Sequence, residues 1–391
     1  MADKEKNTRS AASKERYFQA GVALVTVLLF FGILIGLGCV TTFSEKESFS
    51  ENQNKALASF PKFSGKRLFN GSFTSGLETY VSDHFAWHDE WITAQTYSEL
   101  ALGKKERNNV YFMKNGGLAE KISEPDMTVV GKSISGIQQF ATDNGIMPYI
   151  MIVPTQAEIY SDMLPTDAPN PDQAEFINNV YSQLDGYAVP IDVYSVLSAN
   201  RDDYIYYRTD HHWTSLGAYY GYTALMEAMG MEPVDLADYE RTTVTDQFYG
   251  TIFSASGVRW VAPDRIDTYI PADGVKVTSY FAGTPSQGSL YVDSYLEVKD
   301  KYSYFLGGVQ HLCVVETGLT DAPRLLLIRD SYSDSLTPFL TQSFSQIHLF
   351  DPRYNLSSIQ GYIQDNGIDA VAVLYSIPNY IADEYQFVLS R

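Results

Sequence analysis

Cysteine is almost absent from this chain of 391 residues, which contains only Cys39 and Cys313. Cys39 lies at the end of a long apolar run, and Cys313 lies far along the chain in an apolar, strand-like stretch. A disulfide within one folded domain is therefore excluded, and the domain must be stabilised by its core. We expect Cys313 to be a small buried apolar residue. The spacing of the cysteines indicates no zinc site.

Basic residues are also scarce, since 28 Lys and Arg face 47 Asp and Glu, for a formal net charge of −19. Nucleic-acid binding needs clustered basic side chains that neutralise phosphates, so this class of function is excluded. A hydrophobic content of 45% and a charged content of 19% indicate a chain that buries a sizeable core. Its length predicts one large domain or two smaller ones.

One uncharged apolar run, residues 18–40, is long enough to cross a bilayer. Basic residues precede it, so the positive-inside rule places residues 1–17 in the cytoplasm and the bulk of the chain outside the cell. The run exceeds the usual length of a signal-peptide core, which favours a retained single-pass anchor in the cell membrane over cleavage. A lipoprotein anchored on Cys39 is less favoured, because the leucine usual three residues before such a cysteine is missing.

The remainder divides into a polar linker at residues 41–66 and an extracellular domain at residues 67–391. Strands alternate with helical patterns in this domain, which predicts an α/β fold with a parallel sheet and helices on both faces. The strands are expected at residues 147–154, 324–328, 346–350 and 369–375. Short alternating segments with turn signals at about residues 231–320 predict a β-rich insertion, or a long arm, that frames the site.

The tetrapeptide DHHW at residues 210–213 is the most informative motif. It follows a strand-like run at residues 204–207 and precedes Thr214, which the pattern of the sequence predicts to be a helix cap. Enzymes of the α/β class often place catalytic groups at such strand-to-helix junctions. Asp210 stands two residues before His212, close enough to orient an imidazole nitrogen if the backbone turns.

A second junction supplies a nucleophile. A buried strand at residues 324–328 leads to Asp330 and Ser331, with a helical pattern behind them. Ser331 is therefore expected at the carboxyl end of a central strand and at a helix N-terminus, where backbone N–H groups can stabilise an oxyanion.

The two junctions complement each other. A serine hydroxyl needs a base within hydrogen-bond reach, and the base needs an orienting group. His212 and Asp210 fill these roles for Ser331, and a long separation along the chain is no objection. The adjacent helix N-terminus keeps His212 neutral. We expect His211 to be structural and Trp213 to pack as a wall for the imidazole.

Other interpretations of both motifs stay open. Asp-Ser at residues 330–331 is also a common helix cap. The DHHW segment can also be a packed turn, or a metal site that uses Asp210 with His211 or His212. The residues themselves require neither a metal nor a cofactor for the serine chemistry.

The sequence resembles the DHHW family of bacterial proteins, which are similar to the SGNH-hydrolase-like alginate O-acetyltransferase proteins. The resemblance runs over most of the domain that follows the anchor. It is carried by ENQNKALASFP (51–61), VSDHFAWHDEW (81–91), NNVYFMKNGGL (108–118), IVPTQAEIYSDMLP (152–165), RTDHHW (208–213), FYGTIFSASG (248–257), KYSYFLGG (301–308), LLLIRDSY (325–332) and FDPRYN (350–355).

The resemblance implies a flavodoxin-like, SGNH-hydrolase-like sheet and a triad of Asp210, His212 and Ser331. SGNH enzymes usually carry Gly-Asp-Ser, and Arg329 stands here in place of that glycine. An oxyanion hole normally needs a glycine and an asparagine, and an arginine can hold an anionic sugar group. The weaker candidates for the oxyanion hole or for substrate contacts are Tyr332, Gly308, Asn379, Arg353 and Trp213.

The resemblance further implies transfer of an acyl group, most often acetyl, to an extracellular polysaccharide, or the hydrolysis of such an ester. A membrane-bound O-acyltransferase is the expected partner, and no cofactor or metal is implied. The competing hypothesis is a non-catalytic glycan-binding or assembly subunit, in which the three triad residues would lie too far apart to react.

Overall fold

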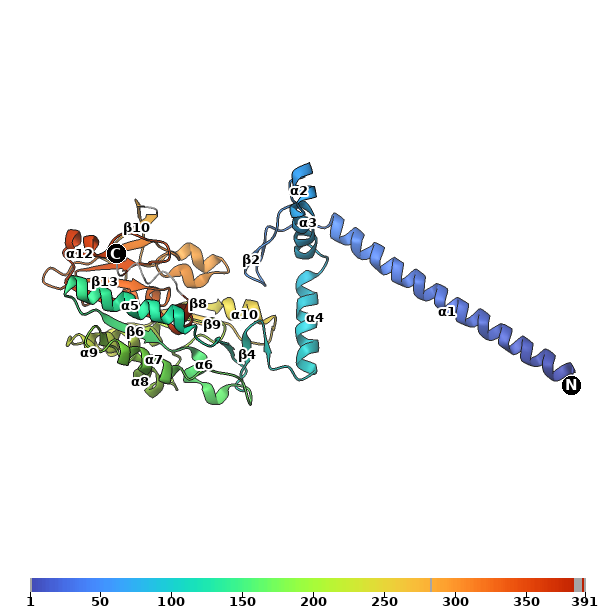
Figure 1. Cartoon of the computed structure of the whole chain (residues 1–391), viewed down its shortest axis with the longest axis horizontal. Helices are drawn as coiled ribbons and strands as arrows, with labels where there is room; N and C mark the ends of the chain where they lie inside the picture. The colour runs from blue at the N-terminus through green and yellow to red at the C-terminus, as the bar shows by residue number, and fades with distance from the viewer. Residues whose placement is uncertain (1, 282, 383–388, 390–391) are drawn as a thin grey trace. The chain divides into compact units, whose positions relative to one another are not determined.

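The computed structural model describes residues 2–281, 283–382 and 389, with side chains from residue 14 onward. The chain forms two compact units, Met1–Gln95 and Thr96–Arg391 (Figure 1). The expected start of the extracellular domain at residue 67 lies within the first unit, and that boundary stays a prediction.

The first unit begins with the long helix α1 (Ala2–Phe43). Its segment Lys14–Phe43 has a mean hydropathy of 2.7, and by length and composition it fits a membrane anchor or a signal sequence. The apolar run predicted at residues 18–40 lies inside this segment. Its large apolar side chains are exposed within the unit.

The polar stretch after α1 is folded against two helices. The elements here are β1 (Phe49–Ser50), β2 (Lys55–Ala56), α2 (Gly65–Phe69), α3 (Ser72–Asp83) and α4 (His88–Ala101). The buried carboxylate of Asp83 accepts hydrogen bonds from Lys55 Nζ at 2.8 Å and from the Ala58 amide at 2.9 Å. Asp89 accepts from Asn52 Nδ2 at 2.8 Å. Part of the predicted linker is thus hydrogen-bonded to Asp83 of α3 and Asp89 of α4.

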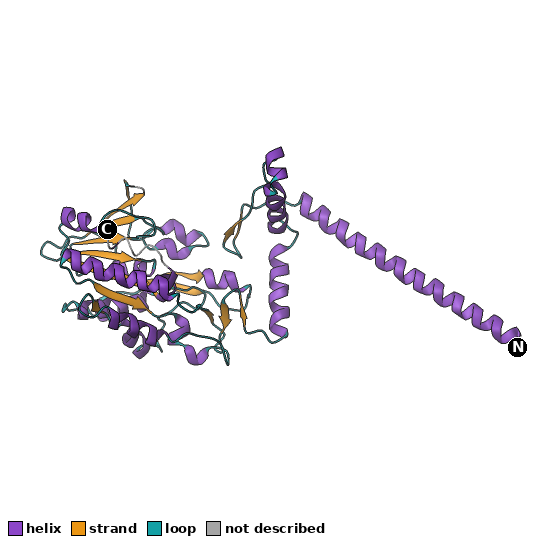
Figure 2. Cartoon of the chain, viewed as in Figure 1, coloured by secondary structure: helices purple, strands orange, loops and turns teal. Residues whose placement is uncertain are grey.

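The second unit is built on an eight-stranded sheet (Figure 2). In spatial order its strands are β11 (Thr284–Gln287), β10 (Lys276–Phe281), β12 (Leu312–Glu316), β14 (Gln346–Phe350), β13 (Arg324–Arg329), β15 (Ala370–Ser376), β6 (Tyr149–Val153) and β7 (Val189–Pro190). The strands from β14 to β7 pair in parallel, and β11, β10 and β12 extend the sheet in antiparallel register.

Apolar helices cover both faces of this sheet. On β13, Leu325 and Leu327 join one core cluster, while Leu326 and Ile328 join the other. This continuous burial explains why the central strands lack the alternation of a half-exposed strand. The helices of the first cluster are α8 (Val193–Ala199), α9 (Ser215–Ala228) and α11 (Tyr332–Leu340), and those of the second are α5 (Met127–Asn144), α7 (Gln173–Gln183), α12 (Ile359–Asn366) and α13 (Ile377–Ala382).

The β-rich insertion differs in part from the expectation. Instead of forming only a separate arm, its strands β10, β11 and β12 complete the main sheet, which is therefore mixed rather than parallel. Cys313, on β12, is fully buried as expected. The other insertion elements are η2 (Leu236–Asp238), the paired strands β8 (Thr242–Phe248) and β9 (Asp264–Thr268), α10 (Thr251–Ser256), η3 (Asp293–Glu297) and η4 (Lys301–Tyr304).

A small three-stranded sheet precedes the main one in the chain. It consists of β3 (Glu106–Arg107), β4 (Val110–Phe112) and β5 (Leu118–Glu120), and the short helices α6 (Gln156–Ile159) and η1 (Ser161–Met163) follow β6. Val110 and Leu118 pack with Ile252 and Phe253 of α10. This contact ties the small sheet to the insertion.

Candidate active site

Ser331 stands between the central strand β13 and helix α11, at the carboxyl edge of the sheet. The preceding residue, Asp330, fixes this turn. Its Oδ2 accepts hydrogen bonds from the Ser376 amide at 2.8 Å, the Ser376 hydroxyl at 2.7 Å and Asn379 Nδ2 at 2.8 Å. The nucleophile candidate is thereby anchored to the end of the neighbouring parallel strand.

The DHHW segment adopts a tight turn rather than the strand-to-helix junction expected from residues 204–207. Tyr206 forms an isolated antiparallel bridge with Trp213, and Thr214 then caps α9 as predicted, accepting from the Gly217 amide at 3.2 Å. The local pattern resembled a strand because these aromatic residues are buried. Within this turn the Asp210 carboxylate accepts a hydrogen bond from the His212 amide.

Trp213 connects the DHHW segment to the turn that carries Ser331. Its buried indole donates from Nε1 to the Tyr332 carbonyl oxygen at 2.9 Å. Helix α9 accommodates the ring through Gly221, where an added Cβ would lie 2.6 Å from the indole. Trp213 therefore links the two motifs, whereas the ring that stacks on the imidazole belongs to Tyr302.

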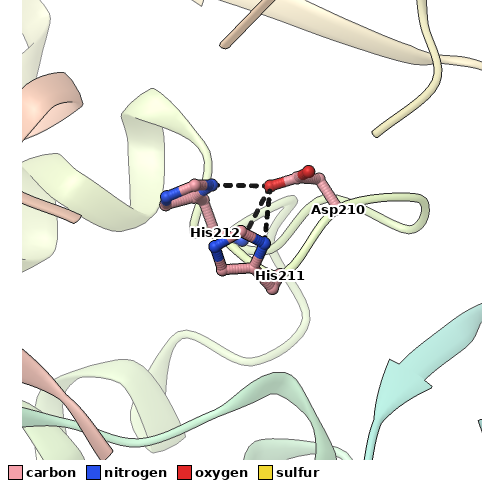
Figure 3. Close-up of side chains that lie close together, drawn as sticks. All are labelled: Asp210, His211 and His212. Atoms are coloured by element: carbon pink, nitrogen blue, oxygen red, sulfur yellow. Dashed lines mark hydrogen bonds and ion pairs between the residues drawn. The ribbon is translucent and has the colours of Figure 1, made fainter. Parts of the chain in front are cut away.

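Asp210, His212 and Ser331 form one hydrogen-bonded chain. The distance from His212 Nε2 to Ser331 Oγ is 2.7 Å, and that from His212 Nδ1 to Asp210 Oδ1 is 2.6 Å. Figure 3 shows the Asp210 carboxylate facing the imidazole rings. Both distances are those of well-formed hydrogen bonds. In this arrangement Nδ1–H donates to the carboxylate and Nε2 accepts the serine proton.

The Asp210 carboxylate is held from two sides. Oδ1 accepts the His212 amide at 3.1 Å, and Oδ2 accepts the Thr251 amide at 2.9 Å and the Thr251 hydroxyl at 3.1 Å. A Cβ at Gly250 would lie 2.3 Å from this carboxylate, so only glycine fits there. Burial favours the neutral acid, but His211, His212 and these hydrogen bonds outweigh it and hold the pKa of Asp210 well below its usual range.

His212 is set up as a neutral base. Burial, with a further contribution from the neighbouring His211, lowers the pKa of His212 below its ordinary value despite the opposing Asp210 charge. The ring of Tyr302 stacks on the imidazole with a centroid distance of 3.7 Å and an interplanar angle of 8°. The Tyr302 hydroxyl donates to the Ser331 carbonyl oxygen at 2.9 Å. One tyrosine therefore contacts both His212 and Ser331.

His211 lies beside the triad with about a third of its side chain exposed, and its expected structural role stays a prediction. Its Nδ1 is 2.9 Å from Thr251 Oγ1 and 3.5 Å from Asp210 Oδ1. Ligand atoms of Asp210, His211 and His212 lie within 4.8 Å of one another, which keeps the metal interpretation open. Both Nδ1 atoms already face the carboxylate, however, and the second nitrogen of His212 faces Ser331.

The weaker candidates lie in different surroundings. Asn379 contacts the site through Asp330, while Arg353 pairs with Asp351 through Nε at 2.9 Å and Nη2 at 2.7 Å. Gly308 has a φ of +84°, a conformation that favours glycine. Among the residues that the structure describes, no hydrogen bond links Gly308 or Arg353 to the triad.

Arg329, which stands where a glycine was expected, is fully buried. Its Nη1 donates to Asp334 Oδ1 of α11 at 2.8 Å. Burial raises the pKa of Asp334 to about 7, while the Arg329 charge opposes this shift. The pair links β13 to α11 across the turn that carries Ser331. An ion pair therefore stabilises this turn, at a position where SGNH enzymes usually have a glycine.

Tyr302, Thr251 and Gly250 are the residues that sequence reasoning missed. They lie in the segments KYSYFLGG and FYGTIFSASG, which carried the family resemblance but had no assigned role. The two segments were recognisable in the sequence as family motifs. The contacts of these three residues with Asp210, His212 and Ser331 depend on the tertiary fold and could not be read from the sequence.

The fold and the site define a mixed α/β protein with a hydrogen-bonded aspartate, histidine and serine at the carboxyl edge of its main sheet. Residues 118–350 match the DHHW protein family. This match covers more than half of the chain, and the chain belongs to the DHHW family.

Solved structures agree with this assignment. The chain is similar to a DHHW family protein from Eubacterium siraeum, with 26% identity and a TM-score of 0.62 over 72% of this chain and 95% of the other. It is also similar in fold to Bacillus cereus PatB1 with a sulfonyl adduct, with 23% identity and a TM-score of 0.60 over 70% of this chain and 96% of the other.

A curated relative is the probable alginate O-acetylase AlgJ of Pseudomonas putida. It is 22% identical over 222 residues, which are 52% of this chain and 52% of the relative. The chain thus spans about half the length of this curated relative.

Proposed function

We propose that this protein is an SGNH-like serine acyltransferase of the cell envelope, which transfers an acetyl group to an extracellular polysaccharide. The observation that carries the proposal is the continuous hydrogen-bonded chain from Asp210 through His212 to Ser331. The long apolar helix would anchor the protein in the cell membrane, with the bulk of the chain outside. The AlgJ relative, a probable alginate O-acetylase, supports the reaction class.

In the first half-reaction, Ser331 Oγ attacks the carbonyl carbon of the acyl donor while His212 Nε2 takes the serine proton. Asp210 stays ionised and stabilises the imidazolium that forms. Collapse of the tetrahedral intermediate breaks the bond to the leaving group, which receives the proton from His212. The products are the released alcohol or thiol and an ester on Ser331.

The oxyanion of that intermediate needs donors. The Tyr332 and Ser333 amides donate to Asp330, and in the described chain no acceptor is found for the Ser331 amide. We assign this amide at the N-terminus of α11 as one oxyanion donor. Gly308 and Asn379 remain weaker candidates for a second.

In the second half-reaction a sugar hydroxyl attacks the Ser331 ester, and His212 removes the hydroxyl proton. The acetyl group moves to the sugar oxygen, and Ser331 regains its proton from His212. Attack by water instead would give esterase activity from the same intermediate. A membrane-bound O-acyltransferase that exports acyl groups is the partner we propose as the source of the donor.

The two alternatives are less well supported. The non-catalytic subunit was expected to hold its triad residues too far apart, and distances of 2.6 and 2.7 Å argue against that expectation. The metal interpretation predicts stoichiometric metal in the purified chain and its loss in Asp210→Asn. Elemental analysis of both proteins distinguishes it from the serine mechanism.

Covalent labelling tests the proposal. The full chain in detergent is incubated with a serine-reactive fluorophosphonate, and the labelled peptide is identified by mass spectrometry. Wild type is expected to be labelled at Ser331, and Ser331→Ala is expected to lose the label. Ser182→Ala, at an exposed serine on α7, is the matched control and should be labelled like wild type. Equal labelling of wild type and Ser331→Ala refutes the assignment.

A further inference from the structure

Strand β5 ends in Glu120, an acidic side chain that the triad does not use. Glu120 pairs in register with Val110 of β4, and Leu118 lies two residues before it on the same strand. Successive side chains of a strand alternate between its faces, so Glu120, Leu118 and Val110 share one face. Val110 and Leu118 both pack against α10 on that face. The Glu120 side chain is therefore directed to the side of β5 that meets α10.

This side borders the candidate active site. Thr251, the first residue of α10, donates two hydrogen bonds to Asp210. The Leu118 amide donates to the Arg208 carbonyl oxygen at 3.3 Å, which joins β5 to the segment that leads into Asp210. Two independent contacts thus place the end of β5 beside the triad.

The pKa shift of Glu120 is consistent with a position beside the triad. Burial raises the pKa of Glu120, the nearby charge of Asp210 raises it further, and His211 opposes the shift. Glu120 in turn contributes to the raised pKa of Tyr332, after burial, Tyr206 and Asp330. The carboxyl group therefore lies within electrostatic range of residues on both junctions.

Glu120 has no ion-pair partner at contact distance in the described part of the chain. The neighbouring Lys121 binds Glu106 at 2.8 Å, and Arg208 binds Asp264 at 3.1 Å. Among the described residues, no side chain forms a hydrogen bond or an ion pair with the Glu120 carboxylate. A partly buried carboxylate without donors is costly, and a ligand that brings donors relieves this cost.

We propose that Glu120 binds the acceptor sugar by accepting hydrogen bonds from its hydroxyl or amino groups, and that it discriminates against acceptors that carry a carboxylate. This inference rests on the acyltransferase function proposed above and names its substrate class. A uronic acid would add a third negative charge beside Glu120 and Asp210, and like charges in a partly desolvated site repel strongly. Arg353, the arginine expected to hold an anionic sugar, is instead neutralised by Asp351.

The experiment compares two acceptors of equal length, a neutral N-acetylglucosamine oligosaccharide and an oligomannuronate. The full chain in detergent receives p-nitrophenyl acetate as donor. Nitrophenolate release without acceptor reports formation of the acyl-enzyme, and mass spectrometry of the oligosaccharides reports transfer. Wild type is expected to transfer acetyl to the neutral acceptor with a kcat/KM at least about tenfold higher than to the mannuronate.

Glu120→Gln keeps the shape of the side chain and removes its charge. We expect the KM for the neutral acceptor to rise about tenfold or more, in line with the loss of a charge-assisted hydrogen bond. The preference over mannuronate should fall by a similar factor, and the effect on acceptor KM should exceed any change in nitrophenolate release. Glu120→Asp, which retains the charge, should retain the preference.

Glu124→Gln makes the same charge change at an exposed residue nearby and should leave release and both acceptor KM values unchanged. The inference about Glu120 is overturned, and the proposed function is not, if Glu120→Gln releases nitrophenolate normally and keeps both the acceptor KM and the preference for the neutral acceptor. A change in release that equals the change in acceptor KM also overturns it, because Glu120 would then act through the triad. Absence of both release and fluorophosphonate labelling in wild type overturns the proposed function together with this inference.

Discussion

Replacing Tyr302 separates its two contacts with the proposed catalytic residues His212 and Ser331. Tyr302→Phe retains the ring stacked at 3.7 Å on His212 but removes the hydroxyl, which bonds the Ser331 carbonyl oxygen at 2.9 Å and Ser335 Oγ at 3.1 Å. Loss of a buried donor costs about 1–3 kcal/mol of stability. The rate of acyl-enzyme formation should fall only a few-fold, because the base keeps its position.

Tyr302→Leu removes the stacked ring as well. An aromatic contact contributes about 1 kcal/mol, which corresponds to about a fivefold loss of rate at neutral pH. Water would also reach His212, whose pKa is lowered mainly by burial. Its pKa should then rise toward the ordinary value, so protonation removes the neutral base at a higher pH than in wild type. The acid limb of the rate profile is expected to move to higher pH.

The assay is nitrophenolate release from p-nitrophenyl acetate by the full chain, measured across the acid and neutral range for wild type and both variants. Tyr302→Phe should retain the acid limb of wild type, and Tyr302→Leu should shift it upward. An unshifted limb in Tyr302→Leu, or an equal loss of rate in both variants, would refute the view that the ring shields and positions the base.

Three further variants test other parts of the site. Asp210→Asn should lower the rate of nitrophenolate release by about 10³- to 10⁴-fold while leaving the fold intact, as in other triads, and an activity near wild type contradicts its role as orienting group. Gly221→Ala places a Cβ 2.6 Å from the Trp213 indole, so the free energy of unfolding measured by urea denaturation should fall by about 1–3 kcal/mol. An unchanged free energy of unfolding would contradict the tight packing at this position. Arg329→Met should lower the free energy of unfolding by about 3–5 kcal/mol, because it leaves Asp334 buried without a partner. The double variant Arg329→Met with Asp334→Leu should recover that stability. Additive losses of stability in calorimetry would contradict this coupling.

The proximity of Asp210, His212 and Ser331 was predictable from two short motifs, while their catalytic role stays a prediction. Asp210 and His212 stand two residues apart, and Ser331 follows an apolar strand, so both junctions were recognisable before they were brought together. The helix cap at Thr214 and the burial of Cys313 follow from local chemistry as well. These features depend on short-range pattern and composition.

The rest depends on contacts between distant segments. Residues 204–207 looked like a strand because they are buried, yet their pairing is limited to one bridge with Trp213. Strands β10 to β12 looked like a separate insertion, and only their pairing with β14 makes them part of the main sheet. Tyr302 is one of 29 tyrosines, and no local signal distinguishes the one that stacks on His212.

The central claim is that Ser331 carries the acyl group. It is tested most directly by acid-quenching the full chain during turnover of p-nitrophenyl acetate and locating the acetyl group by peptide mass spectrometry. One acetyl group is expected on the peptide that contains Ser331 in wild type, with its hydroxyl as the acylated atom, and none on that peptide in Ser331→Ala. Turnover without an acetylated Ser331, or the same acetylation in His212→Ala as in wild type, would contradict the account.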